Sequence, residues 1–347
     1  MLGNPTNLTG VSPLCDRTSD SQPLYEDDWV ASNAIKLLES WAKTAKAEPE
    51  RPPFFMQVNF PGPHPPFAVT AEMEDAVAGV VFPNATDDDT PATLARTGGY
   101  LGRACNTHHE PWSSSIGSRT HPFGRRCDYA AELLNLDKQF ERILSTVSAL
   151  GAEDDTLVCF ASDHGEMLGD HGDYAKQLPW QGSASVPLMC AGPGVKAGQV
   201  ISMPVGTVDL SATFMDFAGA TPAPGMTAVS LRSLLEGQAA RTATNADQKY
   251  RDVVHSGLLG KGVPWRMVMT TQAEKSYKLV CCQGECPTPP TTVPPPFKGW
   301  TTLLICVTDD PYDMHDLARE PAMRPLLSKM MNELPPAFAN GCGQLIE

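Results

Sequence analysis

The order of apolar and polar residues predicts three helices. In residues 27–46, apolar side chains recur at helical spacing, with acids at the start and lysines at the end. A second helix is expected at 128–149, where the apolar positions are Tyr129, Leu133, Leu136, Phe140, Ile143, Leu144 and Val147. A shorter helix is expected to begin at Thr207 and end at Gly219. The first of these helices is amphipathic, so we expect it to cover a sheet.

Short apolar runs predict the strands. They are expected at 54–60, 157–161, 187–191, 265–269 and 277–280. The run 157–161 has the length and composition of a buried strand, and we expect it in a parallel sheet. The last two runs are expected to form a small antiparallel sheet. The helix at 27–46 followed by the strand at 54–60 completes one αβ step.

Candidate chemistry follows the strand expected at 157–161. Asp163, His164 and Gly165 lie just beyond its end, which is where open α/β sheets bind ligands, and Lys176 follows in a glycine-containing loop. Asp163 can bind a hard divalent metal through oxygen. His164 can be a further ligand or a proton donor, and Lys176 can hold a sulfate or phosphate oxygen. The alternative is a turn of solvated polar residues after a core strand.

A single imidazole follows the strand expected at 54–60. His64 lies in Pro61-Gly62-Pro63-His64-Pro65-Pro66-Phe67, where four prolines fix the path of the loop. A lone loop histidine is most often a surface residue. From the residues alone, that interpretation stays open beside a functional one.

One long, ordered segment resembles the second half of the sulfatase family: Ser162-Asp163-His164-Gly165-Glu166-Met167-Leu168-Gly169-Asp170-His171-Gly172, then Lys176, then Val186-Pro187-Leu188. The resemblance extends from about Tyr25 to Ala318. It implies an α/β, alkaline-phosphatase-like fold: a mixed sheet sandwiched by helices, with a small C-terminal antiparallel α+β part. It also implies a partial catalytic domain at 1–235, with a variable insertion at 72–127, and an α+β subdomain at 236–347.

The resemblance implies residue roles as well. Sulfatases hydrolyse sulfate esters with a formylglycine, made from the Cys of a Cys-x-Pro-x-Arg segment near the N-terminus, and a divalent cation, here expected to be Ca²⁺. Asp163 matches a metal ligand and His164 a second one. Lys176 matches a residue that binds a sulfate oxygen. His64 fits a Pro-His-x-Pro pattern whose histidine binds the sulfate ester or protonates the leaving alcohol.

The nucleophile segment is not found in this sequence, because no Cys or Ser opens a Cys-x-Pro-x-Arg pattern. We therefore expect the C-terminal two-thirds of a sulfatase, as a fragment or a diverged chain, that is inactive alone. A phosphodiesterase or phosphonate hydrolase of the same superfamily is an alternative, because half of the shared metal site does not distinguish sulfur from phosphorus. A non-catalytic sulfatase-like binding protein is another.

Net charge and the length of the apolar runs limit the classes of binding partner that we expect. The 347 residues carry a formal net charge of −14, which argues against nucleic-acid binding. No apolar run reaches the roughly eighteen residues of a membrane span. The expected partner is a sulfated small molecule or a sulfated glycan.

Cysteine usage indicates the compartment. Ten cysteines, with possible glycan acceptors at Asn7 and Asn84, favour a glycoprotein of the secretory pathway, extracellular or lysosome-like, with disulfides in its C-terminal part. No signal peptide is recognised. A zinc site at Cys281, Cys282 and Cys286 is the competing interpretation, although their spacing is not a standard one.

Overall fold

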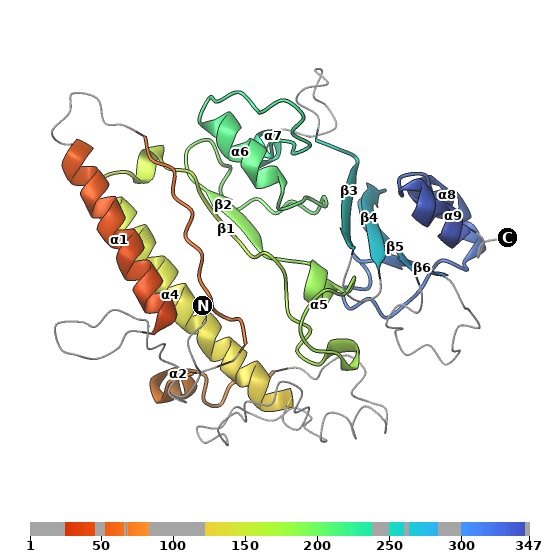
Figure 1. Cartoon of the computed structure of the whole chain (residues 1–347), viewed down its shortest axis with the longest axis horizontal. Coiled ribbons are helices and arrows are strands. Elements are labelled where there is room, and N and C mark those ends of the chain that lie inside the picture. Colours follow the sequence, from red (N-terminus) through yellow and green to blue (C-terminus); the bar gives the residue numbers. More distant parts are fainter. Residues whose placement is uncertain are drawn as a thin grey trace. The chain divides into compact units, whose positions relative to one another are not determined.

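The computed structural model describes residues 25–45, 53–65, 67, 69–82, 122–237, 250–259, 264–283 and 300–343. The chain divides into two compact units, residues 1–155 and 156–347. Figure 1 labels the helices and strands of both. The possible glycan acceptors Asn7 and Asn84, and most of the insertion expected at 72–127, lie outside the described residues. The domain boundary expected at residue 235 stays a prediction.

The first unit is built on two long helices, α1 (Glu26–Ala45) and α4 (Pro122–Ala149), which pack against each other. Both match predicted helices, although α4 begins six residues before the predicted start. A short helix, α2 (Ala71–Ala76), packs against α4. A 3-10 turn, η1 (Glu153–Asp155), follows α4 in the chain. Leu38 of α1 and Val147 of α4 share one apolar cluster, so the predicted apolar faces do form the core here.

The strand expected at 54–60 is not formed, which corrects the prediction. The segment is extended, and its side chains alternate between half-buried and exposed, as the period of two requires. Phe54 and Met56 pack into the cluster of Leu38 and Val147, whereas Phe55 is 74% exposed. Apolar alternation sets an extended backbone, but a strand also needs a neighbour to pair with. The described part of the chain supplies none.

The second unit begins with a two-stranded sheet. Strand β1 (Val158–Ala161) pairs antiparallel with β2 (Leu188–Ala191), so the parallel sheet expected around 157–161 is wrong for this pairing. The expectation of a buried strand is also wrong for β1, because Val158, Cys159 and Phe160 are half-buried and Ala161 is exposed. An apolar composition fixes neither the cover of a strand nor the direction of its partner. A disulfide joins Cys159 to Cys190, which are direct partners in the register.

Three short helices are described between residues 156 and 237 of the second unit: α5 (Gln181–Ala184), α6 (Asp209–Phe217) and α7 (Arg232–Leu235). Helix α6 confirms the helix predicted between Thr207 and Gly219. A 3-10 turn, η2 (Asp170–Gly172), lies in the loop between β1 and β2.

The C-terminal part is an antiparallel sheet of four strands in sequence order: β3 (Val253–Leu258), β4 (Trp265–Gln272), β5 (Lys275–Gln283) and β6 (Trp300–Cys306). This confirms the small antiparallel sheet. Ala273 and Glu274, both with positive φ, form the two-residue turn between β4 and β5.

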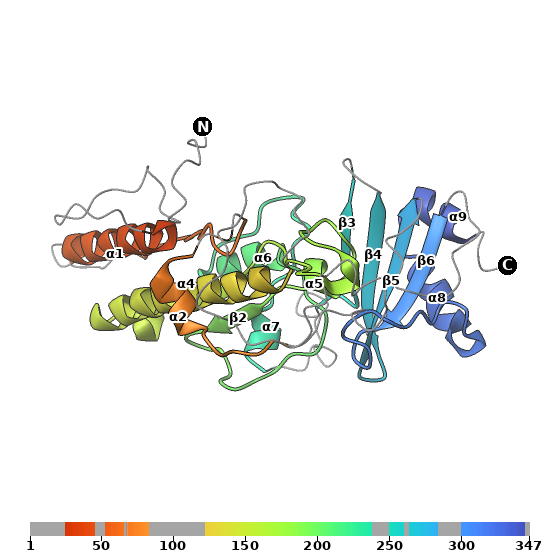
Figure 2. The same ribbon diagram turned by 90° about the horizontal axis from the view of Figure 1, so that it is seen from below.

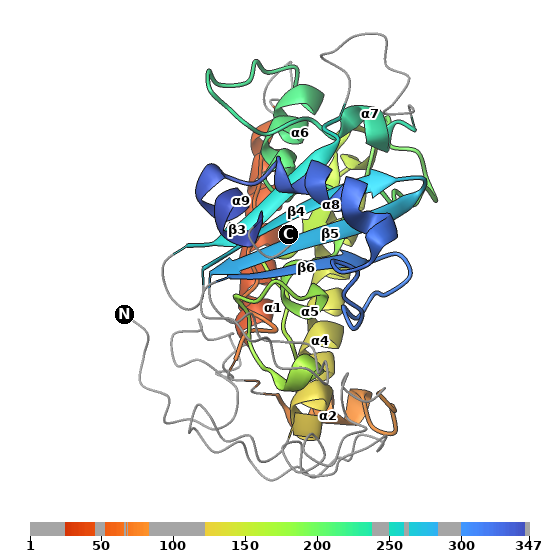
Figure 3. The same ribbon diagram turned by 90° about the vertical axis from the view of Figure 1, so that its right-hand side faces the viewer.

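Both faces of this sheet are covered. Alternate residues of β5 point to opposite sides of the sheet, and each side packs against another part of the chain. Leu279 and Cys281 pack against residues of the helices α8 (Arg324–Met331) and α9 (Pro336–Gly343), which follow the 3-10 turn η4 (Pro321–Met323). Figures 2 and 3 show these two helices beside the sheet. Val280 and Cys282 face Met167 and Trp180, which belong to the loop after β1. The sheet therefore supports that loop directly.

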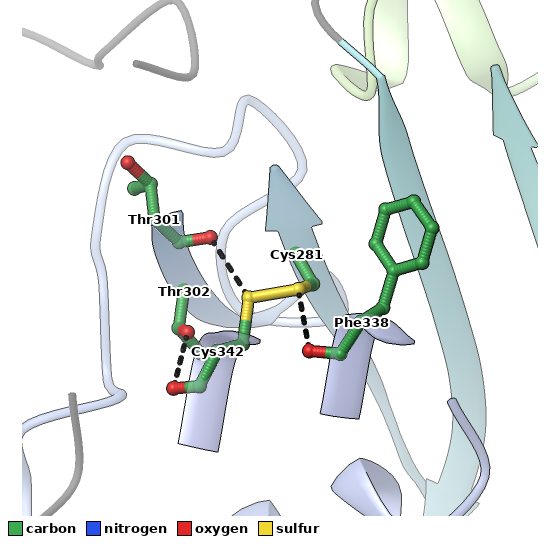
Figure 4. Close-up of a disulfide and its surroundings, with 5 residues drawn as sticks. All are labelled: Cys281, Thr301, Thr302, Phe338 and Cys342. Carbon is green, nitrogen blue, oxygen red and sulfur yellow. Dashed lines mark hydrogen bonds between the residues drawn. A yellow bond between two sulfur atoms is a disulfide. The ribbon is translucent and has the colours of Figure 1, made fainter. Parts of the chain in front are cut away.

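A second disulfide, Cys281–Cys342, joins β5 to α9 (Figure 4). The carbonyl oxygens of Phe338 and Thr301 each lie 3.4 Å from one of its sulfurs. This confirms disulfides in the C-terminal part. It also overturns the competing zinc interpretation, because the Cys281 sulfur is already bonded.

Candidate functional site

The predicted metal ligands Asp163 and His164 lie directly after β1. The Asp163 side chain is 86% exposed, and its Oδ1 accepts a hydrogen bond of 2.9 Å from the His164 backbone N–H. The His164 Nδ1 lies 2.9 Å from the Gly165 carbonyl oxygen. Because a carbonyl only accepts, Nδ1 carries the proton in this contact. Nε2 then faces Asp163 Oδ2, at 3.5 Å.

This arrangement fits part of a divalent-cation site. A metal-binding His commonly donates its other ring N–H to a carbonyl, as His164 does to Gly165, which leaves the second nitrogen available. Nε2 of His164 and Oδ2 of Asp163 can then bind one cation together. Within the described ranges, no group of three or more His, Cys, Asp or Glu side chains could hold a metal. Since Ca²⁺ takes six to eight oxygens, these two residues supply only a part of its ligands.

The backbone after His164 is fixed by a close approach to α5. The Gly165 N–H donates to the Ser183 carbonyl at 2.8 Å. A Cβ at position 165 would lie 2.1 Å from the Gly182 carbonyl oxygen, so only glycine fits. The candidate ligands are therefore tied to the far end of their own loop.

Lys176 lies half-buried on the returning side of this loop. Its neighbours Ala175 and Gln177 both have left-handed backbone, with φ of 67° and 74°. The Ala175 N–H donates to Glu166 Oε1 at 2.5 Å, and the Gln177 carbonyl accepts from the Trp265 indole at 2.9 Å. Hydrogen bonds thus hold the backbone on both sides of the lysine.

His64 belongs to the first unit, whereas the other three candidates belong to the second. Its ring is exposed, and Nδ1 lies 2.7 Å from the Pro65 carbonyl oxygen. Its backbone N–H donates to the Pro61 carbonyl at 3.1 Å. The loop is therefore an ordered turn, and the role of His64 stays a prediction.

Asp27, which the sequence pattern does not single out, supports the His64 loop. It lies fully buried on α1, and its Oδ1 accepts a hydrogen bond of 3.1 Å from the Gly62 N–H. Its Oδ2 has no partner among the described residues. Burial raises the pKa of Asp27 to about 6, against the opposing effect of the Gly62 hydrogen bond. Acids are common in the first turn of a helix, so the sequence does not show that this one is buried.

A second group that the sequence pattern does not single out is a buried ion pair. Lys278 of β5 and Asp313 lie 2.5 Å apart and are both fully buried. Burial lowers the pKa of Lys278 and raises the pKa of Asp313, and their mutual attraction opposes both shifts. A lysine inside the apolar run of 277–280 was the available signal, because a lysine is almost never fully buried unless it is paired.

A family model described as Sulfatase matches residues 5–220, well over half of the chain. The chain belongs to the sulfatase family. It is 27% identical to an arylsulfatase of Clostridium perfringens over 243 residues, covering 67% of this chain but 44% of that sulfatase. The chain thus spans less than half the length of this relative and matches the C-terminal part of its relatives.

Solved structures show the same fold. The protein BT4656, in complex with its substrate D-glucosamine-2-N,6-O-disulfate, matches with a TM-score of 0.65 and 18% identity, over 90% of this sulfatase chain and 69% of that one. A phosphonate monoester hydrolase of Agrobacterium radiobacter matches with a TM-score of 0.61 and 21% identity, over 94% and 64%. The fold is therefore alkaline-phosphatase-like, as predicted.

No helix among the described residues is long and apolar enough to cross a membrane.

Proposed function

We propose that this sulfatase chain supplies the second half of a sulfuric-ester hydrolase site. The observation that carries the proposal is the placement of Asp163 Oδ2 and His164 Nε2, 3.5 Å apart at the end of β1, in a chain that matches the sulfatase family over 5–220. An exposed carboxylate beside a nitrogen with an available lone pair suits a cation, and the cation suits an anionic ester.

The chain's own residues would then take separate parts. Asp163 and His164 would hold a divalent cation, for which we propose Ca²⁺. When bound, this ion would offset the negative charge that develops on the ester oxygens. Lys176, on a backbone held from both sides, would bind a sulfate oxygen as a compact positive charge. His64 would bind the sulfate or deliver a proton to the leaving alcohol.

The nucleophile is the part that these 347 residues do not supply. They contain no Cys-x-Pro-x-Arg pattern, so a formylglycine of the family's type would have to come from outside the sequence. We therefore propose that the chain alone does not turn over sulfate esters. Its substrate as part of an active enzyme would be a sulfated small molecule or a sulfated glycan.

A phosphoryl or phosphonyl ester hydrolase is the second candidate. The likeness to the phosphonate monoester hydrolase, at a TM-score of 0.61, favours it, because a cation and a lysine serve either anion. A non-catalytic sulfatase-like binding protein is the third. Disulfides at Cys159–Cys190 and Cys281–Cys342 support the secretory pathway as the compartment.

The test compares the 347-residue chain with the same chain extended by the upstream coding sequence of its gene. An in-frame Cys-x-Pro-x-Arg, with turnover of an aryl sulfate above that of an aryl phosphonate, supports the sulfatase. The reverse preference supports the phosphonate hydrolase, and the absence of any turnover supports the binding protein. In the active form, His64→Ala should lower aryl-sulfate turnover by about 10²-fold or more. His255→Ala, which removes an exposed imidazole of β3, should not.

A further inference from the structure

The buried ion pair Lys278–Asp313 holds the end of the loop that carries the candidate site. Lys278 Nζ donates to the Pro179 carbonyl at 3.0 Å. Asp313 Oδ2 accepts a hydrogen bond of 2.6 Å from the Gln181 N–H, in addition to its contact with Lys278. Each charge therefore binds the other charge and one backbone group of the loop.

The C-terminal sheet and the turn after β6 contact this loop at alternate residues. The Trp265 indole of β4 binds the carbonyl of Gln177, Lys278 binds that of Pro179, and Asp313 binds the N–H of Gln181. These three contacts begin at the residue directly after Lys176. The backbone from Lys176 to the start of α5 is thus fixed by side chains from much later in the chain. The three contacts join residues that are 88, 99 and 132 positions apart.

A ring stack ties the middle of the loop to the same place. The His171 ring stacks on Trp180 at 4.6 Å between centroids. Its Nε2 lies 2.8 Å from the carbonyl oxygen of Tyr312, the residue before Asp313. Trp180 is fully buried, with Lys278 Nζ 6.0 Å from its ring centroid. The turn at 312–313 therefore accepts hydrogen bonds from the middle of the loop, at His171, and from its end, at Gln181.

We propose that Lys278 and Asp313 are positioning residues for Lys176, acting by anchoring Pro179 and Gln181. The inference rests on the proposed function, because it concerns the lysine that would bind the ester oxyanion. A buried ion pair is weak evidence for a stability role, since an apolar pair often replaces one without loss. Here both charges also satisfy loop backbone groups, which an apolar pair would not do.

The sharpest test removes one anchor and leaves the ion pair in place. Gln181→Pro deletes the N–H that donates to Asp313. Gln181 is the first residue of α5, where proline is tolerated, and Trp180 has the extended backbone that precedes proline, with φ −74° and ψ 153°. Gln181→Ala is the matched control. Both variants lose the side-chain Oε1, which lies 3.5 Å from Lys278 Nζ, and only the alanine variant keeps the N–H.

Two readouts on the 347-residue chain separate positioning from stability. Amide hydrogen exchange in 163–181 should be faster by about tenfold in Gln181→Pro and within about twofold of wild type in Gln181→Ala. The rate at which acetic anhydride acylates Lys176, followed by peptide mass spectrometry, should change in the proline variant alone. Equal exchange and equal acylation in the two variants would overturn the inference.

A second set of variants keeps the question decidable if the proline variant does not fold. Lys278→Met with Asp313→Leu replaces the buried pair by apolar groups. Lys275→Met with Asp309→Asn removes an exposed pair of the same 2.5 Å separation, also with its lysine on β5. Positioning predicts faster exchange in 163–181 for the first double variant even where its thermal midpoint matches wild type. Wild-type exchange there would overturn the proposal.

Inorganic sulfate separates this inference from the proposed function. Sulfate should slow Lys176 acylation in wild type and Gln181→Ala but not in Gln181→Pro. An absence of protection in wild type would contradict the anion-binding role, while the exchange and acylation rates without sulfate would still decide whether Lys278 and Asp313 position the lysine.

Discussion

Asp27→Asn should remove a pH-dependent destabilisation of the chain. The buried Asp27 carboxyl receives one hydrogen bond, from the Gly62 N–H, and its second oxygen has no partner in the described part of the chain. Burial raises its pKa from 3.8 to about 6. Its folded-state pKa therefore lies above the unfolded value, so its contribution to stability is full below about pH 3.8 and is lost as the pH rises through about 6.

The magnitude follows from the size of this shift. A shift of about two pKa units, at about 1.4 kcal/mol per unit, corresponds to about 3 kcal/mol across the full range. Between about pH 4.5 and pH 7.5, about 2 kcal/mol of this is lost. Asparagine is close in shape and can still accept from Gly62, but it does not titrate. The wild type should thus lose about 2 kcal/mol more than the variant over this pH interval.

Urea unfolding at the two pH values measures this difference. The comparison uses the change with pH in each protein, so other titrating groups, such as Asp128, whose pKa burial raises to about 7, cancel. Asp154→Asn, at an exposed carboxyl, is the control and should behave as wild type. If Asp27→Asn lost as much stability with rising pH as wild type, Asp27 would not be a charge confined to an apolar site.

Three further outcomes are expected. Ca²⁺ should bind the 347-residue chain weakly, roughly at millimolar concentration or above, and calorimetry should show that Asp163→Asn abolishes this binding whereas Asp170→Asn does not; the opposite pattern would move the metal away from the end of β1. Replacing both Cys281 and Cys342 by serine should lower the free energy of unfolding by about 4 kcal/mol, because the bond closes a loop with a separation of 61 residues, and a loss near zero in denaturant melts would contradict this. Gly62→Ala should destabilise the chain by about 1–3 kcal/mol, because its Cβ would lie 2.5 Å from Asp27 Oδ2; an unchanged melting temperature would show that α1 and the His64 loop can separate.

Periodicity predicted the elements whose structure depends on local pattern. The apolar residues of α1 and α4 face a common core, and the alternation in β4 and β5 fits a sheet covered on both faces. The errors concern pairing. An apolar run such as 54–60 specifies an extended backbone and one buried side, but whether a strand lies beside it depends on distant residues. The antiparallel pairing of β1 with β2 depends on distant residues in the same way.

The residues of the candidate site also fall into those that a local pattern predicts and those that depend on distant contacts. Asp163 and His164 are neighbours in the sequence, so their contact could be expected, and Lys176 shares their loop. Asp27 and the pair Lys278–Asp313 could not be found this way, because burial over long sequence separations gives them their importance. A sequence pattern shows which groups can do chemistry, whereas the groups that hold them in place become visible only in the folded chain.

The disulfide between Cys159 and Cys190 has a consequence for proteolysis. It closes residues 159–190 into a covalent ring, and Asp163, His164 and Lys176 all lie inside it. A protease that cuts once within the ring cannot release either half, so a nicked molecule keeps the three side chains on one covalent frame. Gel electrophoresis would show such a nick only after reduction. An intact band on a non-reducing gel is therefore no proof that this loop is uncut.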